Sequence, residues 1–197
     1  FMQDELSRKR AAHFDALYRA NPDPWNYLAS AYEADKYRAT IAALPQHQFR
    51  SCLEIGCSIG VLTEMLSTRA DHVTGVDLSE EALRSARSRL SAVARVQLHR
   101  LTIPAQWPQG RWDLVVLSEV AYYLSADEIA SLSTRIAEST YPKAWCLLVN
   151  WTGETQTIWH GPDAARALID GLSELRQISH LERIQHPQFV IDLVALS

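Results

Sequence analysis

Two glycines and one carboxylate are spaced along the chain as a nucleotide-binding site requires. The segment Leu53-Glu-Ile-Gly-Cys-Ser-Ile-Gly60 lies between a short apolar run and a helical pattern. Glycine lets the backbone turn sharply there, and the free amides that begin the next helix can receive a carboxylate or a phosphate. Asp77 ends the next apolar run, about 20 residues after Gly56, where nucleotide-binding α/β proteins hold ribose hydroxyls. The pattern predicts a nucleotide-type cofactor.

The glycine segment departs from the dinucleotide fingerprint G-x-G-x-x-G, because Ser58 stands at the middle glycine position and the spacing is Gly56-x-x-x-Gly60. A serine would crowd a pyrophosphate but could hydrogen-bond a small polar group. Glu54, two positions before the first glycine, is a negative charge that suits a cationic ligand such as the amino group of a methionine moiety. From these residues alone, three alternatives stay open: a tight turn without a ligand, a nicotinamide-dependent oxidoreductase, and a non-catalytic binding module.

These residues need a sheet to position them, and strand and helix patterns alternate through most of the chain. Continuous apolar strands between helices predict a mostly parallel sheet with helices on both faces. A closing hairpin, Leu175–Arg183 and Phe189–Leu196 around His186-Pro187, predicts a last strand that runs antiparallel. Two helices precede the sheet, at Gln3–Arg19 and Ser30–Leu44. We expect strands at Ser51–Ile55, His72–Val76, Val96–Arg100, Asp113–Leu117 and Trp145–Trp151, and helices at Val61–Thr68, Glu80–Leu90, Asp127–Glu138 and Asp163–Leu172.

Composition narrows the class of protein. The 197 residues are 47% hydrophobic and 21% charged with a net charge of −4, which predicts a globular chain and gives no electrostatic reason to expect a nucleic-acid partner. Arg84, Arg87 and Arg89 are interpreted as the solvated face of a helix. The three cysteines form no CxxC pair, so we expect no disulfide framework and no metal, and a reducing, cytoplasmic location. No membrane span or secretory signal is visible, and the oligomeric state stays open.

The glycine segment and Gly75-Val-Asp77-Leu-Ser resemble the first two motifs of the class I S-adenosylmethionine-dependent methyltransferases. Arg111-Trp-Asp-Leu-Val-Val-Leu-Ser-Glu119 resembles the fourth-strand motif of the same family. The resemblance implies a Rossmann-like, mostly parallel seven-stranded sheet with an antiparallel last strand, preceded by N-terminal helices. It also implies S-adenosyl-L-methionine as cofactor, with S-adenosyl-L-homocysteine as product.

A closer resemblance is to the nodulation protein S family. It rests on Asp23-Pro-Trp-Asn-Tyr27, Ser30-Ala-Tyr-Glu-x-x-Lys-Tyr37 and Leu117-Ser-Glu-Val-x-Tyr-Tyr-Leu124. That family N-methylates the deacetylated end of chitooligosaccharides during Nod factor synthesis, so the resemblance implies a small oligosaccharide substrate. A methyltransferase for another small molecule is the rival interpretation.

The resemblance to class I methyltransferases also assigns candidate cofactor residues. The glycine loop faces the methionine part, Asp77 binds the ribose, and Leu78, Leu101 and Thr102 lie beside the adenine. Ser118 ends the fourth strand beside the methyl group, and Tyr32 is the best candidate for a covering side chain. The expected cofactor residues are therefore Glu54, Gly56, Cys57, Ser58, Gly60, Asp77, Leu78, Leu101, Thr102, Ser118 and Tyr32.

Acceptor residues are expected above the carboxyl edge of the sheet, where α/β proteins bind ligands. Glu119 follows a buried strand and could orient an amine or take its proton, although a solvated or helix-capping carboxylate is the alternative. His160, in the loop after Trp151, could also act as a base. Aromatic faces suit the C–H face of a sugar, and core packing is the alternative for them. The candidates are Glu119, His160 and Tyr122 for catalysis, and Trp25, Glu119, Tyr123, Trp151 and Trp159 for substrate binding.

We expect one methyltransferase domain over residues 1–197. Within it, residues 1–45 would form a helical lid or cap, and residues 46–197 would form the Rossmann-like core. Such a lid would exclude water from the reacting centre.

Overall fold

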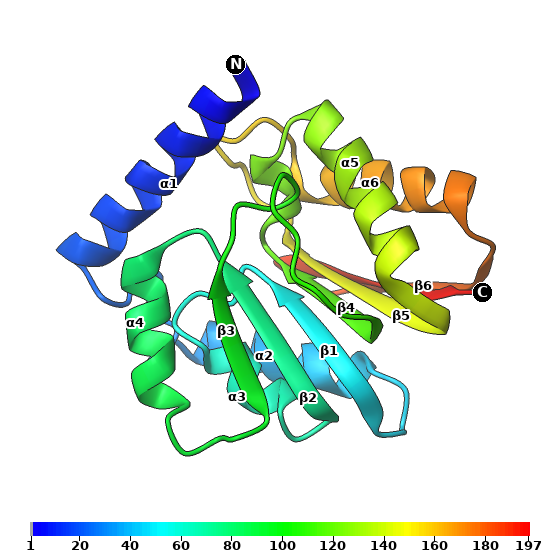
Figure 1. Ribbon diagram of the computed structural model, residues 1–197, viewed down its shortest axis with the longest axis horizontal. Coiled ribbons are helices and arrows are strands. Elements are labelled where there is room, and N and C mark those ends of the chain that lie inside the picture. Colours follow the sequence, from blue (N-terminus) through cyan, green and yellow to red (C-terminus); the bar gives the residue numbers. More distant parts are fainter. Residues whose placement is uncertain (1) are drawn as a thin grey trace.

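A twisted seven-stranded sheet runs through the part of the chain that the computed structural model describes, residues 2–197 with side chains from residue 5. The strand order is β3-β2-β1-β4-β5-β7-β6, and β7 runs antiparallel to β5 and β6 while the other pairs are parallel. This confirms the predicted mostly parallel sheet with an antiparallel last strand (Figure 1). The strands are β1 (Phe49–Ile55), β2 (Ala70–Asp77), β3 (Val96–Arg100), β4 (Trp112–Ser118), β5 (Thr140–Trp151), β6 (Ile178–Gln185) and β7 (Phe189–Leu196).

Local sequence signals define several of the helix starts. Ser30 accepts a hydrogen bond from the Glu33 amide, and Ser79 accepts one from the Ala82 amide, so each serine satisfies a donor that the first turn leaves unpaired. Within residues 2–197, no helix is long and apolar enough to cross a lipid bilayer. The helices are α1 (Met2–Ala20), α2 (Ala31–Ala43), α3 (Val61–Leu66), α4 (Glu80–Arg89), η1 (Ala121–Tyr123), α5 (Ala126–Ser139) and α6 (Gly161–Leu175).

Helices cover both faces of the sheet because each central strand is apolar on both sides. In β4, Val115 and Leu117 belong to the core beneath α5 and α6, whereas Leu114 and Val116 belong to the core beneath α2 and α3. All four side chains are 1% exposed or less. This two-sided burial explains the continuous apolar run that predicted a parallel sheet.

The largest differences between the predicted boundaries and the structure lie at two places in the C-terminal half. Helix α6 continues to Leu175, so the strand expected from Leu175 begins only at Ile178. Strand β5 begins at Thr140, well before the expected Trp145, and contains Pro142 and a left-handed residue, Lys143 at φ 63°. Proline and a left-handed residue are both unusual in a strand, and the register of β5 with β4 shifts there.

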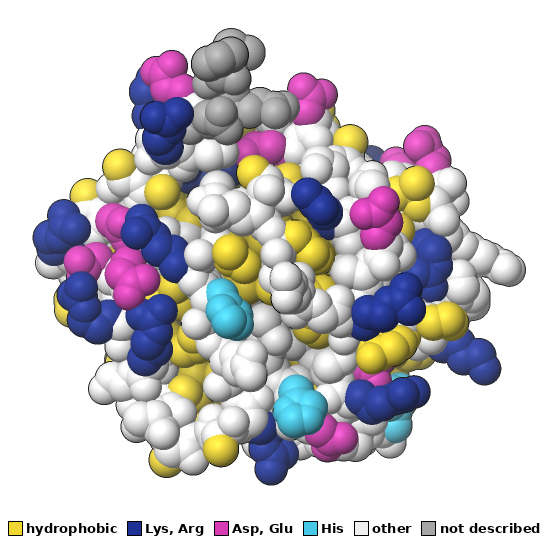
Figure 2. Space-filling model, viewed as in Figure 1, with side chains coloured by type: hydrophobic (Ala, Val, Ile, Leu, Met, Phe, Trp, Pro, Cys, Tyr) yellow, Lys and Arg dark blue, Asp and Glu magenta, His cyan; other side chains and the backbone are white. Residues whose placement is uncertain are grey.

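Arg84 and Arg87 of α4 lie on the predicted solvated face, whereas Arg89 is half-buried and donates to the Ile59 carbonyl at 3.1 Å. Arg84 pairs with Glu81 and Arg87 with Glu80, each at 2.6 Å. On the face shown in Figure 2, acidic and basic side chains are interspersed over α4. Such exposed pairs contribute little to stability and create no single-sign patch.

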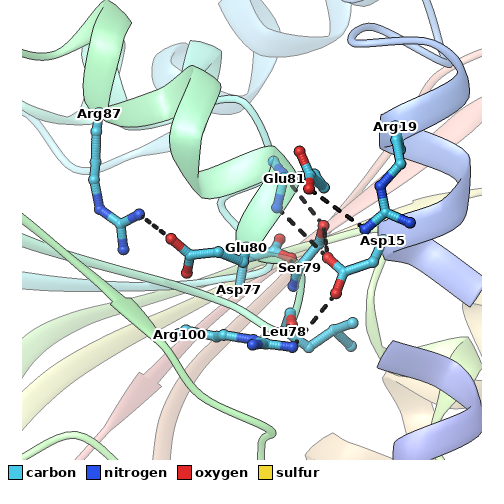
Figure 3. Close-up of polar contacts among 10 residues, drawn as sticks. Asp15, Arg19, Asp77, Leu78, Ser79, Glu80, Glu81, Arg87 and Arg100 are labelled. Carbon is cyan, nitrogen blue, oxygen red and sulfur yellow. Dashed lines mark hydrogen bonds and ion pairs between the residues drawn. The ribbon is translucent and has the colours of Figure 1, made fainter. Parts of the chain in front are cut away.

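Helix α1 lies above the carboxyl ends of the strands and is tied to elements on both sides of them (Figure 1). Arg10 donates to both carboxylate oxygens of Glu128 at the start of α5, at 3.2 and 2.9 Å. At the other side, Asp15 accepts from the Ser79 hydroxyl at 2.7 Å and pairs with Arg100 at 3.4 Å. Figure 3 shows this second group of contacts beside Asp77. These contacts hold α1 over the edge of the sheet where a ligand would bind.

Leu168→Ala should lower the free energy of unfolding by about 2–5 kcal/mol, because the Leu168 side chain is fully buried between the sheet and α5. Leu175→Ala on the same helix is the matched control, since that side chain is 49% exposed and its loss should cost less than about 1 kcal/mol. Urea unfolding followed by circular dichroism measures both. Equal losses for the two variants would contradict this description of the α6 packing.

Candidate active site

A cavity opens between the carboxyl ends of β1, β2, β3 and β4 and the underside of α1. About 820 Å³ of empty space lies within it, part of this space open to solvent at the mouth. It lies where the strand order reverses between β1 and β4, the position at which open α/β sheets bind ligands. Its lining includes Arg10, Phe14, Tyr18, Trp25, Tyr27, Gly56, Ser58, Asp77, Leu78, Leu101, Ile103, Ser118, Glu119, Val120, Tyr122 and Tyr123.

Asp77 defines one part of this cavity, which we call the nucleoside end. Its Oδ2 accepts from the Ser58 amide and its Oδ1 from the Ser79 amide, both at 2.9 Å. A carboxylate has about four acceptor positions, so these two bonds leave each oxygen able to accept from a ligand hydroxyl. Burial raises the pKa of Asp77 above its ordinary value, while these amide bonds oppose the rise. Leu78 and Leu101 stand beside it as apolar walls.

The glycine segment makes the bend that keeps the cavity open at the end of β1. Gly56 has φ +79°, and a Cβ there would lie 2.2 Å from a methyl carbon of Val120 across the gap to β4. Ser58 also adopts a left-handed conformation, at φ 50°, a region that an L-residue enters only at a cost. Its hydroxyl makes a short hydrogen bond with the Tyr18 hydroxyl of α1. The position that the dinucleotide fingerprint gives to glycine is therefore left-handed here too.

Glu119 defines the other part of the cavity, which we call the acceptor end. It directly follows β4 and has φ 58°, a left-handed conformation in a residue that is not glycine. Its Oε2 lies 2.5 Å from the ammonium nitrogen of Lys36 on α2, and its side chain is 18% exposed. The carboxylate that the sequence places at the edge of the sheet therefore lines the cavity and has a buried cationic partner.

Aromatic rings wall the acceptor end. Phe14 of α1 contacts Tyr123 edge to face at 5.2 Å between ring centroids, and it lies 6.1 Å from Trp25. Trp25 in turn lies 5.8 Å from Tyr27. Trp25 remains 37% exposed, so this wall continues from the cavity to the surface.

The structure brings together ten of the predicted site residues and places the others elsewhere. Cys57 is buried against Gly75 of β2, and Gly60 caps α3 and packs against α4. The Thr102 amide donates to Gln106 in the loop after β3. Glu54 lies within β1 and is 2% exposed. None of these four cofactor candidates lines the cavity.

Four further candidates pack outside the cavity. Tyr32 contacts Trp151 edge to face at 5.6 Å, so each shields the other. The Trp159 indole donates to the Leu124 carbonyl at 2.9 Å. His160 caps α6, is exposed, and lies 3.0 Å from the Thr152 carbonyl. The loop after β5 thus folds against η1 and α6. None of these four side chains lines the cavity, and their proposed roles stay predictions.

Sequence reasoning expected a helical lid over residues 1–45 but missed the side chains of α1 that line the cavity. Arg10, Phe14 and Tyr18 all line the cavity, and their spacing of four residues places them on one face of a helix. That stripe of one arginine and two aromatic rings was a usable signal. Lys36 offered no such signal, because its burial depends on contacts with residues far away in sequence. Among the described residues, no group of three or more His, Cys, Asp or Glu side chains could hold a metal ion.

The chain resembles known methyltransferases. The family model for nodulation protein S (NodS) matches residues 14–138. Nodulation protein S of Sinorhizobium fredii is 27% identical over 135 residues, which cover 67% of this chain and 62% of that protein. A ubiquinone biosynthesis O-methyltransferase of Hydrogenovibrio crunogenus is 29% identical over 138 residues, covering 68% of this chain and 51% of that protein. The chain thus spans about half to three fifths of the length of these relatives.

A solved structure supports the fold. The N-methyltransferase NodS of Bradyrhizobium japonicum, in complex with S-adenosyl-L-homocysteine, superposes with a TM-score of 0.75 over 92% of this chain and 96% of that one. The sequence identity is 19%. This likeness shows that the two chains share the arrangement of sheet and helices.

Glu54→Gln should stabilise the protein increasingly as the pH rises. Burial raises the pKa of Glu54 from 4.5 to about 8, with a further rise from the charge of Asp77. Between pH 4.5 and 8, the folded state keeps the Glu54 proton while the unfolded state loses it. The stability that protonated Glu54 contributes is therefore fully present below pH 4.5 and is lost by pH 8. The neutral glutamine avoids that loss, an advantage of up to about 5 kcal/mol at the higher pH.

Thermal unfolding at these two pH values measures the Glu54→Gln effect. Glu64→Gln on α3 is the matched control, because the Glu64 side chain is 53% exposed and its replacement should change stability by less than about 0.5 kcal/mol. An advantage of Glu54→Gln that did not grow between the two pH values would contradict the prediction.

Proposed function

The chain belongs to the nodulation protein S family, and on this premise we propose that it is a methyltransferase that uses S-adenosylmethionine to methylate the free amine of a deacetylated chitooligosaccharide. One observation carries the proposal. The ends of β2, β1 and β4 place Asp77, the Gly56 bend and Glu119 around a single cavity. That cavity has a hydroxyl-binding carboxylate at its nucleoside end and a proton-accepting carboxylate at its acceptor end.

The residues at the nucleoside end fit the cofactor. Asp77 would accept from the ribose hydroxyls through oxygens that already hold two amide donors. The adenine would lie between Leu78 and Leu101, whose side chains are apolar and line the cavity. Gly56 leaves room for the amino-acid part because no Cβ fits beside Val120. The cofactor would supply a methyl group on a positively charged sulfur, which needs no metal or covalent enzyme intermediate to react.

The residues at the acceptor end fit an amino sugar. An amine must be neutral before its lone pair can attack, and Glu119 is placed to take the proton of an incoming ammonium group. In that step one N–H bond breaks, the electron pair stays on the nitrogen, and an O–H bond forms on Glu119. The proton passes to water after the product leaves. Trp25 and Tyr123 present ring faces and edges that suit the C–H surface of a saccharide.

The helical segment would exclude water from this reaction. We propose that residues 1–45 act as the lid of a single catalytic domain whose core is residues 46–197. In support, α1 is held over the cavity by Arg10 at α5 and by Asp15 at α4. Excluding water strengthens the electrostatic interaction between Glu119 and the acceptor, and it limits hydrolysis of the cofactor. The three free, buried cysteines suit a reducing compartment and support a cytoplasmic location.

Asp77→Asn should weaken the binding of S-adenosylhomocysteine by roughly 10–100-fold, because an amide nitrogen cannot accept from a ribose hydroxyl and charged acceptors contribute about 1.5–3 kcal/mol. Calorimetry measures this, with NAD as a second ligand that should not bind. Asp71→Asn is the matched control, since Asp71 lies at the opposite end of β2 with an exposed side chain. Unchanged affinity in Asp77→Asn, or a preference for NAD, would overturn the cofactor assignment.

Methyl transfer from radiolabelled S-adenosylmethionine to glucosamine oligomers tests the acceptor. We expect label on oligomers with a free amine and none on the fully N-acetylated oligomers, because an amide nitrogen lacks an available lone pair. Methyl transfer to a phenolic acceptor is measured for comparison, since one relative is named as an O-methyltransferase. Transfer to the phenol but not to the amine would refute the acceptor class and leave the cofactor assignment standing.

A further inference from the structure

A buried lysine stands behind the acceptor end of the cavity, held between two carboxylates. The Lys36 side chain is 0% exposed, and its ammonium nitrogen lies 2.8 Å from Glu33 Oε2 and 2.5 Å from Glu119 Oε2. Glu33 is on the same turn of α2, whereas Glu119 follows β4, 83 residues along the chain. The rings of Tyr32 and Tyr37 lie 5.4 and 5.6 Å from the same nitrogen. We call Glu33, Lys36 and Glu119 the charge cluster.

The charge cluster has an unequal number of charges. Burying an ammonium group is costly unless it is paired, and one carboxylate is enough to pair it. Here two carboxylates share one ammonium, so the ionised cluster carries one net negative charge. The excess lies at the cavity, because Glu119 is the member that lines it.

Neighbouring groups do not cancel this excess. Arg10 lines the cavity, but both carboxylate oxygens of Glu128 engage its guanidinium. Asp23 adds negative charge near Glu33, whose pKa is raised first by burial and also by Asp23 and Glu119, against the effect of Lys36. The nearby tyrosines contribute no charge, because burial and also the charge of Glu119 raise the pKa of each hydroxyl; they are Tyr27, Tyr32, Tyr37, Tyr122 and Tyr123.

The ion pair also fixes the direction of Glu119. A left-handed backbone at a residue with a Cβ is strained, and the Glu119 amide is held by the Val149 carbonyl at 2.8 Å. The contact with Lys36 uses Oε2. In the described residues no hydrogen bond uses the other oxygen, Oε1, which leaves it for a ligand.

We propose that Lys36 and Glu33 are positioning residues, which hold Glu119 toward the amine and set the negative charge that favours an ammonium group at the acceptor end. This inference rests on the proposed function and adds these two residues to its acceptor end. The excess negative charge attracts an ammonium group and disfavours a carboxylate or phosphate acceptor. The Lys36 ammonium contacts Oε2 of Glu119 at 2.5 Å and so holds the carboxylate in place to accept the proton that the amine must lose.

Three variants separate charge from simple packing. Glu33→Gln makes the cluster neutral, Lys36→Met makes it doubly negative, and the double variant Lys36→Met/Glu33→Gln restores one net negative charge. Asp35→Asn is the matched control, because Asp35 is exposed on the same helix and pairs with Arg38. Circular dichroism and S-adenosylhomocysteine binding establish that each variant is folded.

The first measurement is calorimetry with the S-adenosylhomocysteine-loaded protein. The probes are the glucosamine disaccharide and its N-acetylated twin. We expect the parent and Asp35→Asn to prefer the amine, and Glu33→Gln to reduce that preference about tenfold, as a change of one charge at close range implies. Equal binding of the two probes by the parent, or an unchanged preference in Glu33→Gln, would overturn the proposal.

The second measurement is the pH profile of kcat/KM for methyl transfer to the glucosamine disaccharide. In Lys36→Met, the two carboxylates lose the ammonium group between them, and their mutual repulsion favours a cluster that holds a proton, so the acidic limb should move to higher pH by about one unit or more. The double variant should move the limb back toward that of the parent. A purely structural lysine would lower activity equally at every pH, and that result would refute the role of Lys36.

The two measurements also distinguish a failure of this inference from a failure of the proposed methyltransferase function. If the parent prefers the amine probe but transfers no methyl group to any amine, the methyltransferase proposal fails and the amine-selecting cluster stands. If the parent methylates the amine while Glu33→Gln and Lys36→Met behave like Asp35→Asn, the cluster fails and the methyltransferase proposal stands.

Discussion

The site depends on the directions in which the chain leaves two neighbouring strands, β1 and β4. Strand β1 leads into α3, which packs on one face of the sheet through Leu62 and Leu66. The adjacent strand β4 leads into η1 and α5, which packs on the other face through Leu132 and Ile136. Because the two connections leave in opposite directions, a gap opens between the strand ends. Gly56 and Val120 border this gap, and the cavity follows from it.

Periodicity along the chain was enough to predict the sheet and the edge at which a ligand would bind. Asp77 and Glu119 were predictable because each directly follows a buried strand, and the end of a strand fixes where the next side chain lies. Trp159 and His160 were expected at the same edge on weaker grounds, since a loop after a strand can fold either way. The Trp159 indole bonds to Leu124, a contact between segments that are distant in sequence and that no local pattern predicts.

Lys36 shows the limit of local reasoning more clearly. A lysine in a charged helix is usually solvated, and the local sequence pattern does not indicate that the Lys36 side chain is buried. Its environment is decided by Glu119 and by the rings of Tyr32 and Tyr37. The start of β5 was missed for a similar reason, because Pro142 and Lys143 argue locally against a strand that pairing with β4 nevertheless imposes.

The hydrogen bond between Ser58 and Tyr18 has an evolutionary consequence. Ser58 occupies a left-handed turn at which glycine would relieve backbone strain. Glycine at position 58 would, however, remove the hydroxyl that is hydrogen-bonded to Tyr18. The residues at positions 18 and 58 should therefore covary among related chains. Where the turn has glycine, position 18 no longer needs a hydroxyl and can become phenylalanine; where the turn has serine, tyrosine should persist. Pairwise covariation would then link the loop to the helix above it.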